Sequence, residues 1–249
     1  MSYNQNMDKG IGFNRNIKLD WLDATAAFCA ETDDPAEIRV RLRPIVRQSI
    51  DSQTNIRKSI DILLNIWLRS GEIAPALQAK AVAYYRETAV PADRLWLHYG
   101  LTLVTYPFFF NTTTIIGQSI RYEDAITTPL VRKRLMAAMG ELGSLEAAVS
   151  RIIYSLRDWG ILLETGERNT YVPRYRGFNA STLELEAWLL ACVLKAHPGE
   201  ELPFPDLVNH PALFPFHFTT TAGQLRDHAA FAIHRQGLGL DMVRLGIGD

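Results

Sequence analysis

The sequence predicts a mainly helical protein with an N-terminal helical bundle, a winged helix-turn-helix with a short β-hairpin wing, and a small C-terminal α+β unit. Through about residue 105, apolar side chains recur at three- and four-residue steps, with no strand-like alternation. Residues 144–173 combine an amphipathic helix with a tight hairpin, and residues 177–249 begin with a helix and end in two short strands. We therefore expect a flexible arm over 1–16, the bundle over 17–105, the winged helix over 106–176 and the α+β unit over 177–249.

The composition is that of an ordinary globular protein, with 47% hydrophobic and 21% charged residues and a net charge of −1. Such a balance argues against a general non-specific nucleic-acid binder but allows a local basic patch. Cys29 and Cys192 are far apart in apolar, helical surroundings, so we predict two buried thiols in a reducing compartment. The N-terminus lacks the apolar core of a signal peptide, and the longest apolar run, 187–194, is too short to cross a bilayer. We expect a cytoplasmic protein without membrane contact.

The predicted bundle has helices at about 19–30, from 35 onward, at 52–68, 74–88 and 93–104, and Pro44 should kink or split the second. Arg39, Arg43 and Arg47 lie four residues apart and stack along one side of that helix. Arg57 and Lys58 add to this second basic patch. The patch is interpreted either as a solvated face that pairs with Glu37 and Asp51, as a further nucleic-acid surface, or as a docking site for an acidic partner.

The central unit is predicted from caps and periodicity. Residues 108–121 supply a first helix, Thr128 caps a second that ends at Gly140, and Ser144 caps a third that ends at Gly160. The apolar face of the third helix comprises Leu145, Ala148, Val149, Ile152, Leu156 and Trp159. Two strands, 161–164 and 169–172, follow around a turn at 165–168, where Gly166 is expected to take positive φ. The alternative is a helical hairpin and a β-hairpin that only pack on their neighbours.

Two further segments frame this unit. The aromatic run 106–110 is interpreted as core that joins the bundle to the winged helix, or else as an exposed platform for stacking bases. After residue 177, Ser181 and Glu184 predict a capping box for a helix that ends near His197. Four prolines break up 202–218, with one helical turn expected at 206–209; a helix at 221–229 and two strands within 231–245 follow. The order resembles that of the central unit, which suggests a second, degenerate winged helix there.

Basic charge concentrates in the central unit. Residues 121–176 hold nine Lys or Arg against seven acids, whereas residues from 177 onward hold four against eight. Because Lys and Arg neutralise phosphates, this distribution favours duplex DNA contact through the third helix and the wing. The candidate DNA-binding residues are Arg132, Lys133, Arg134, Ser150, Arg151, Tyr154, Ser155, Arg157, Arg168 and Arg174, with Arg39, Arg43 and Arg47 in the bundle. The alternative is a solvated helix face and an ordinary turn.

No catalytic or metal-binding pattern is present in the sequence. The six histidines form no HExxH pair and no Cys/His ligand set, and there is no phosphate-binding loop, dinucleotide fingerprint or GxSxG elbow. We expect neither enzymatic activity, nor a cofactor, nor a metal ion.

The chain resembles the BrxA family, the small winged-helix component of bacteriophage exclusion (BREX) defence systems. The resemblance covers about residues 15–173: a helical N-terminal domain, the run Tyr-Pro-Phe-Phe-Phe at 106–110, Thr-Thr-Pro-Leu-Val-Arg-Lys-Arg at 127–134, and Arg-Ile-Ile-Tyr-Ser-Leu-Arg-Asp-Trp-Gly-Ile-Leu at 151–162. It implies a bacterial, non-enzymatic DNA-binding protein that works with other proteins of an anti-phage system. Residues 181–249 depart from the pattern. The competing hypotheses are a protein–protein interaction module in a larger complex and RNA binding through the bundle.

Overall fold

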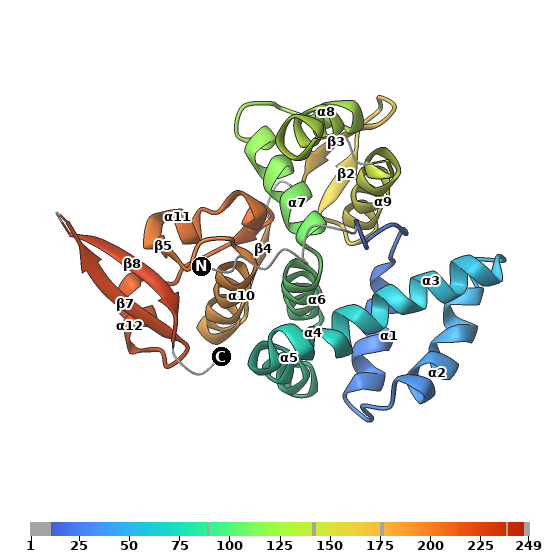
Figure 1. Cartoon of the computed structure of the whole chain (residues 1–249), viewed down its shortest axis with the longest axis horizontal. Helices are drawn as coiled ribbons and strands as arrows, with labels where there is room; N and C mark the ends of the chain where they lie inside the picture. The colour runs from blue at the N-terminus through green and yellow to red at the C-terminus, as the bar shows by residue number, and fades with distance from the viewer. Residues whose placement is uncertain (1–10, 89, 141–142, 175–176, 238, 247–249) are drawn as a thin grey trace.

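The computed structural model describes residues 11–88, 90–140, 143–174, 177–237 and 239–246. These residues are mainly helical and include three small sheets. The N-terminal helices lie at one end of the molecule and the C-terminal hairpin at the other, while α6 (Pro91–Thr105) and α10 (Leu183–Ala196) pack together between them (Figure 1). Among the described residues, no helix combines the length and apolar character that crossing a bilayer requires.

The N-terminal part is helical, as predicted. It comprises α1 (Leu19–Cys29), α2 (Pro35–Arg47), α3 (Gln53–Leu64), the π-helical turn η1 (Asn65–Arg69), α4 (Ser70–Ile73), α5 (Pro75–Glu87) and α6. Asp34 caps α2 by accepting from the amide of Ala36, and Ser52 caps α3 in the same way. Pro44 does not split α2, which continues to Arg47. Only the bond to the carbonyl of Val40 is lost, and Val40 is exposed, so water can hydrate that carbonyl.

The segment before α1 is packed, not free. Residues 1–10 lie outside the described residues, but Phe13, expected within a flexible arm, is fully buried. Its ring centroid lies 5.4 Å from that of Tyr106 and 5.3 Å from that of Phe109. The expected arm is therefore wrong for residues 11–16, because one aromatic side chain fixes them to the core.

The central part consists of α7 (Pro107–Ile120), β1 (Ile126–Thr127), α8 (Thr128–Met139), α9 (Leu145–Asp158), β2 (Leu162–Glu164) and β3 (Thr170–Pro173). Its antiparallel sheet has the order β1-β3-β2. Thr127, one residue before the expected cap, accepts from the amide of Leu130. Ser144 precedes α9 but makes no side-chain cap. Both helices begin close to where the sequence predicts them.

The hairpin between β2 and β3 turns at a different residue from the one predicted. Asn169 has a φ of 57°, whereas Gly166 is not among the residues with positive φ. The loop spans 165–169, one residue longer than expected, and its left-handed residue is the last one. Asparagine tolerates this conformation better than most other non-glycine residues.

The C-terminal part consists of β4 (Phe178–Asn179), α10, β5 (Glu201–Pro203), α11 (Phe204–Val208), the 3₁₀ turn η2 (Pro211–Leu213), β6 (Phe216–His217), α12 (Ala222–Asp227), β7 (Phe231–Gln236) and β8 (Leu240–Leu245). β4 and β6 pair in parallel. The larger sheet has the order β5-β8-β7, so its first strand lies beside its last, as in the central sheet. Thr182, not Ser181, caps α10 by accepting from the amide of Leu185.

Close packing holds the central and C-terminal parts against the bundle. Tyr106 and the three phenylalanines at 108–110 are buried, which confirms the core interpretation of the aromatic run and rules out an exposed stacking platform. Gly100 on α6 faces α10 so closely that an added Cβ would lie 2.5 Å from the ring of Trp188. The two free cysteines are buried, as predicted.

Candidate nucleic-acid interface

Helix α9 is fixed at its C-terminal half by the chain that precedes α1. The amide of Ile17 donates to Oγ of Ser155 over 2.8 Å, and the indole of Trp159 donates to the carbonyl of Ile17 over 2.8 Å. Oδ2 of Asp158 accepts from the amide of Leu19 over 2.8 Å and so caps α1 from another helix. Ser155 is fully buried, so its prediction as a DNA-binding residue is wrong. The segment from Ile17 to Leu19 covers the side of α9 on which Ser155 lies.

The rest of the polar surface of α9, which begins one turn before Ser155, remains accessible. Arg151 is exposed, and Ser150 and Tyr154 are half-buried on the same face. Ser150 Oγ accepts from Arg132 of α8 over 2.8 Å, which links the two helices. The guanidinium of Arg157 lies 5.2 Å from the centre of the Tyr154 ring and pairs with Glu164 on β2. The polar side chains on the accessible surface of α9 therefore contact α8 and the hairpin as well as one another.

Three of the predicted basic residues of this unit form ion pairs with carboxylates. Arg132 pairs with Glu146 at 3.4 Å, Arg134 with Glu123 at 3.2 Å, and Arg157 with Glu164. Arg134 also donates to Ser119, so it is held toward α7.

The remaining cations of the unit have no such partner. Across the described ranges, Lys133, Arg151 and Arg168 have no carboxylate within ion-pairing distance, and all three are exposed. Arg174 is exposed and lies over the ring of Phe178, 5.2 Å from its centre. Among the described residues of the central unit, the exposed basic side chains without an ion pair are these four and Arg121, whose guanidinium donates to the carbonyl of Asn209.

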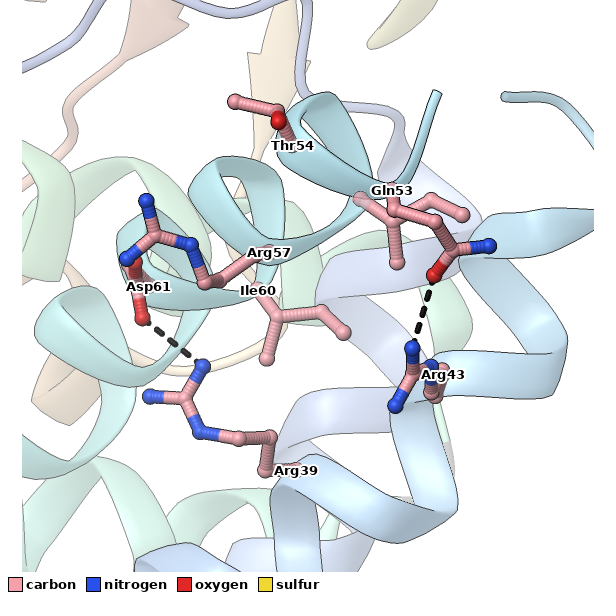
Figure 2. Close-up of a pocket in the computed structure, with 8 residues that line it drawn as sticks. Arg39, Arg43, Gln53, Thr54, Arg57, Ile60 and Asp61 are labelled. Atoms are coloured by element: carbon pink, nitrogen blue, oxygen red, sulfur yellow. Dashed lines mark hydrogen bonds and ion pairs between the residues drawn. The ribbon is translucent and has the colours of Figure 1, made fainter. Parts of the chain in front are cut away.

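The second basic patch forms a cleft between α2 and α3. Arg39 pairs with Asp61 at 2.8 Å, and Arg43 donates to Gln53 at 2.7 Å, as Figure 2 shows. The expected pairing of the patch with Glu37 and Asp51 is wrong, since Glu37 pairs with Arg41.

Two members of that patch do not line the cleft. Arg57 lines the cleft, whereas Arg47 and Lys58 are exposed outside its lining. The sequence signal that was missed is the four-residue spacing of Gln53, Arg57 and Asp61, which places them on one face of α3 toward α2.

Two buried polar groups outside both patches have structural partners. The imidazole of His98 accepts from the indole of Trp67 at 3.1 Å and contacts Asp23 at 3.0 Å. Burial lowers the pKa of His98, and the hydrogen bond and charge of Asp23 oppose that shift. Glu186 is buried and accepts from the amide and hydroxyl groups of Thr219 and Thr220. The imidazole of His98 and the carboxylate of Glu186 thus have their hydrogen-bond partners within the fold.

A second hollow, missed by sequence reasoning, lies between α5, α6 and α10. It measures about 310 Å³ and is lined in part by Tyr84, Glu87, Asp93 and Glu184. Burial and the charge of Glu184 raise the pKa of Tyr84 to about 12. Asp93 already accepts from the amide and hydroxyl of Ser181, so its carboxylate is occupied within the fold.

The described residues contain no group of three or more His, Cys, Asp or Glu side chains arranged to hold a metal ion. Comparisons of this chain with protein-family models, with curated proteins and with solved structures found no match.

Proposed function

We propose that residues 107–173 form a winged helix-turn-helix and that this unit binds duplex DNA. The order of its elements, α7, β1, α8, α9, β2 and β3, supports the assignment, together with the strand order β1-β3-β2. α9 directly precedes the hairpin and presents a polar face, which is the position of a recognition helix.

The observation that carries the proposal is the exposed guanidinium of Arg151 in the middle of α9, without a carboxylate partner among the described residues. Lys133 on α8 and Arg168 on the hairpin share this property. Cations without internal partners are free to neutralise phosphates, and an arginine on a recognition helix can also pair with a guanine edge.

Duplex binding measured by fluorescence anisotropy across a range of salt concentrations tests the proposal. Binding should weaken as salt rises, because each neutralised phosphate releases counterions. The double variant Arg151→Gln with Arg168→Gln should bind at least about tenfold more weakly, and its salt slope should be shallower by about 2.

Arg235→Gln is the matched control. Arg235 lies exposed on β7 of the other hairpin and contacts Asp241 at 3.6 Å, so its loss should leave duplex affinity nearly unchanged. Absence of duplex binding at low salt, or an equal loss in the control, would contradict the proposal and favour a unit that contacts proteins.

We also infer that α10, β5, α11, α12, β7 and β8 form a second winged helix. The order β5-β8-β7 supports this, since it repeats the order of the central sheet. The helix before this hairpin, α12, has only six residues, and Arg226 on it pairs with Asp241 at 2.8 Å. Arg226 and Arg235 both contact Asp241, and the composition from 177 onward is acidic, so this unit is not assigned to DNA.

Because the chain resembles the BrxA family, we further propose that the protein binds DNA without catalysing a reaction. We propose that it acts beside other proteins of an anti-phage system. A phage-plating assay tests this role. Cells that carry the double variant at unchanged protein level should lose resistance, whereas cells with Arg235→Gln should keep it. Equal resistance in both strains would contradict the proposed role.

A further inference from the structure

The cleft between α2 and α3 holds more positive charge than its own carboxylate neutralises. Its lining includes the three arginines Arg39, Arg43 and Arg57 and a single acid, Asp61, which gives a formal charge of +2. The cavity measures about 470 Å³, within the range of small-molecule sites.

The two helices set this arrangement by running antiparallel. Arg39 on α2 meets Asp61 on α3, whereas Arg43, one turn later on α2, meets Gln53, two turns earlier on α3. Figure 2 shows Ile60 between these two pairs. The cleft therefore has a polar pair at each end and an apolar stretch between them.

Two of the guanidinium groups are available to a ligand. Arg43 bonds only to the neutral amide oxygen of Gln53, and Arg57 has no ion pair or side-chain hydrogen bond to any residue that the structure describes. Ile56 and Ile60, each 2% exposed, provide the apolar lining beside them.

We propose that this cleft binds a nucleotide, with its phosphate on Arg57 at the end that Arg39 and Asp61 form, and its base toward Arg43, against Ile56 and Ile60 (Figure 2). A phosphate monoester carries about −1.5 to −2 charges and so balances the formal charge of the cleft, whereas a single carboxylate does not. Arginine binds phosphate through two parallel hydrogen bonds and stacks on the flat faces of bases. The volume exceeds what inorganic phosphate alone would fill.

Calorimetric titration with a nucleoside 5′-monophosphate tests the site in the full-length protein. Saturable binding below about 1 mM is expected. Arg57→Gln should weaken it about tenfold, since one charge-assisted contact is lost. Asp61→Asn should strengthen it several-fold, because Arg39 is then released from its carboxylate.

Lys58→Gln is the matched control, because Lys58 adjoins Arg57 on α3, is exposed and lies outside the cleft lining. Its affinity should stay within about twofold of the wild type. No saturable binding, equal weakening in Lys58→Gln and Arg57→Gln, or no gain in Asp61→Asn would overturn the proposal. A thermal unfolding midpoint measured for each variant separates loss of binding from loss of fold.

The nucleotide can be free or the end of a strand, and further titrations separate these sources. A 5′-phosphorylated single-stranded tetranucleotide that binds more tightly than both the free nucleotide and its unphosphorylated counterpart assigns the site to a strand end. Equal affinity for the free nucleotide and the phosphorylated strand assigns it to the free ligand. Inorganic phosphate that binds as tightly as the nucleotide, or a phosphoserine peptide that binds more tightly, would overturn the nucleotide assignment. Arg151→Gln with Arg168→Gln should leave all of these affinities unchanged, so failure here is distinct from failure of duplex binding.

Discussion

The hydroxyl of Ser155 accepts a hydrogen bond from the backbone amide of Ile17, 138 positions earlier in the chain, over 2.8 Å. The carbonyl of Ile17 also accepts from the indole N–H of Trp159, and the amide of Leu19 donates to the carboxylate of Asp158. The helix proposed to read DNA is therefore positioned by the N-terminal bundle as well as by its own sheet. This segment covers the C-terminal turn of α9 that carries Ser155, whereas Arg151, one turn earlier, stays exposed.

Replacement of Ser155 by alanine should destabilise the protein by about 1–3 kcal/mol, because the amide of Ile17 would stay buried without an acceptor. Urea denaturation followed by circular dichroism measures this free energy of unfolding. Ser144→Ala is the control, since Ser144 directly precedes the same helix, is exposed and makes no side-chain cap bond, and should cost less than about 0.5 kcal/mol. Similar losses in the two variants would show that the bond to Ile17 contributes little.

The burial of Ser155 illustrates what local patterns predict and what they miss. Helical periodicity correctly placed Leu145, Val149 and Ile152 in the core, because that face is set by the 3.6-residue repeat. Ser155 is polar and borders that face, so nothing in its neighbourhood indicates that a distant segment covers it. Phe13 is the counterpart: an aromatic residue in a polar stretch whose partners, Tyr106 and Phe109, lie far along the sequence.

The charged sites show the same limit. Spacing placed Arg39 and Arg43 on one side of α2, and the structure keeps them together. Their partners Asp61 and Gln53 lie on α3, and only the packing of two helices brings them into range. The two-residue strand β1 was missed for a related reason, since it exists only through its pairing with β3.

In the first hairpin, Gly166→Ala should be neutral or stabilise the protein by about 0.5 kcal/mol. Gly166 has no atom within 4 Å of an added Cβ and no positive φ, and alanine restricts the unfolded chain more than glycine does. Asn169→Ala should instead cost about 1 kcal/mol, because alanine has no side-chain hydrogen bond to offset the left-handed conformation. Thermal melts of the two single variants measure which substitution is the more destabilising. Gly166→Ala would be the more destabilising of the two if Gly166 had the positive φ that the sequence predicts.

Replacement of Gly100 by alanine should destabilise the protein by about 1–3 kcal/mol, since α6 or the Trp188 ring must move to admit the methyl group. Gly223→Ala provides the comparison. Gly223 lies in α12, and its added Cβ would approach no atom closer than 3.9 Å, so this variant should gain up to about 1 kcal/mol from helix propensity. Equilibrium denaturation of both variants measures the contrast. A neutral Gly100→Ala would mean that α6 and α10 pack less tightly than described.

Acid should destabilise the protein through His210 before most carboxylates titrate. Burial lowers the pKa of His210 to about 4 from an ordinary value of 6.5, and the charges of His197 and Arg121 act in the same direction. Between these two values the unfolded chain binds the proton and the folded chain does not, so the free energy of unfolding falls as pH drops below 6.5. The contribution of this group lost between pH 7 and 5 is about 2 kcal/mol.

His210→Asn is the variant that isolates this effect, because an asparagine oxygen can still accept from the amide of Ala212, as Nδ1 does at 3.2 Å. Its stability at pH 7 should fall, since the stacking of the imidazole on Phe110 is lost. The further decrease from pH 7 to 5 should be smaller than in the wild type by about 2 kcal/mol, as measured by urea denaturation at a series of pH values. The buried imidazole of His98, whose pKa is also lowered, remains in both proteins and produces the residual slope. Parallel pH profiles for the two proteins would contradict the assignment of the acid sensitivity to His210.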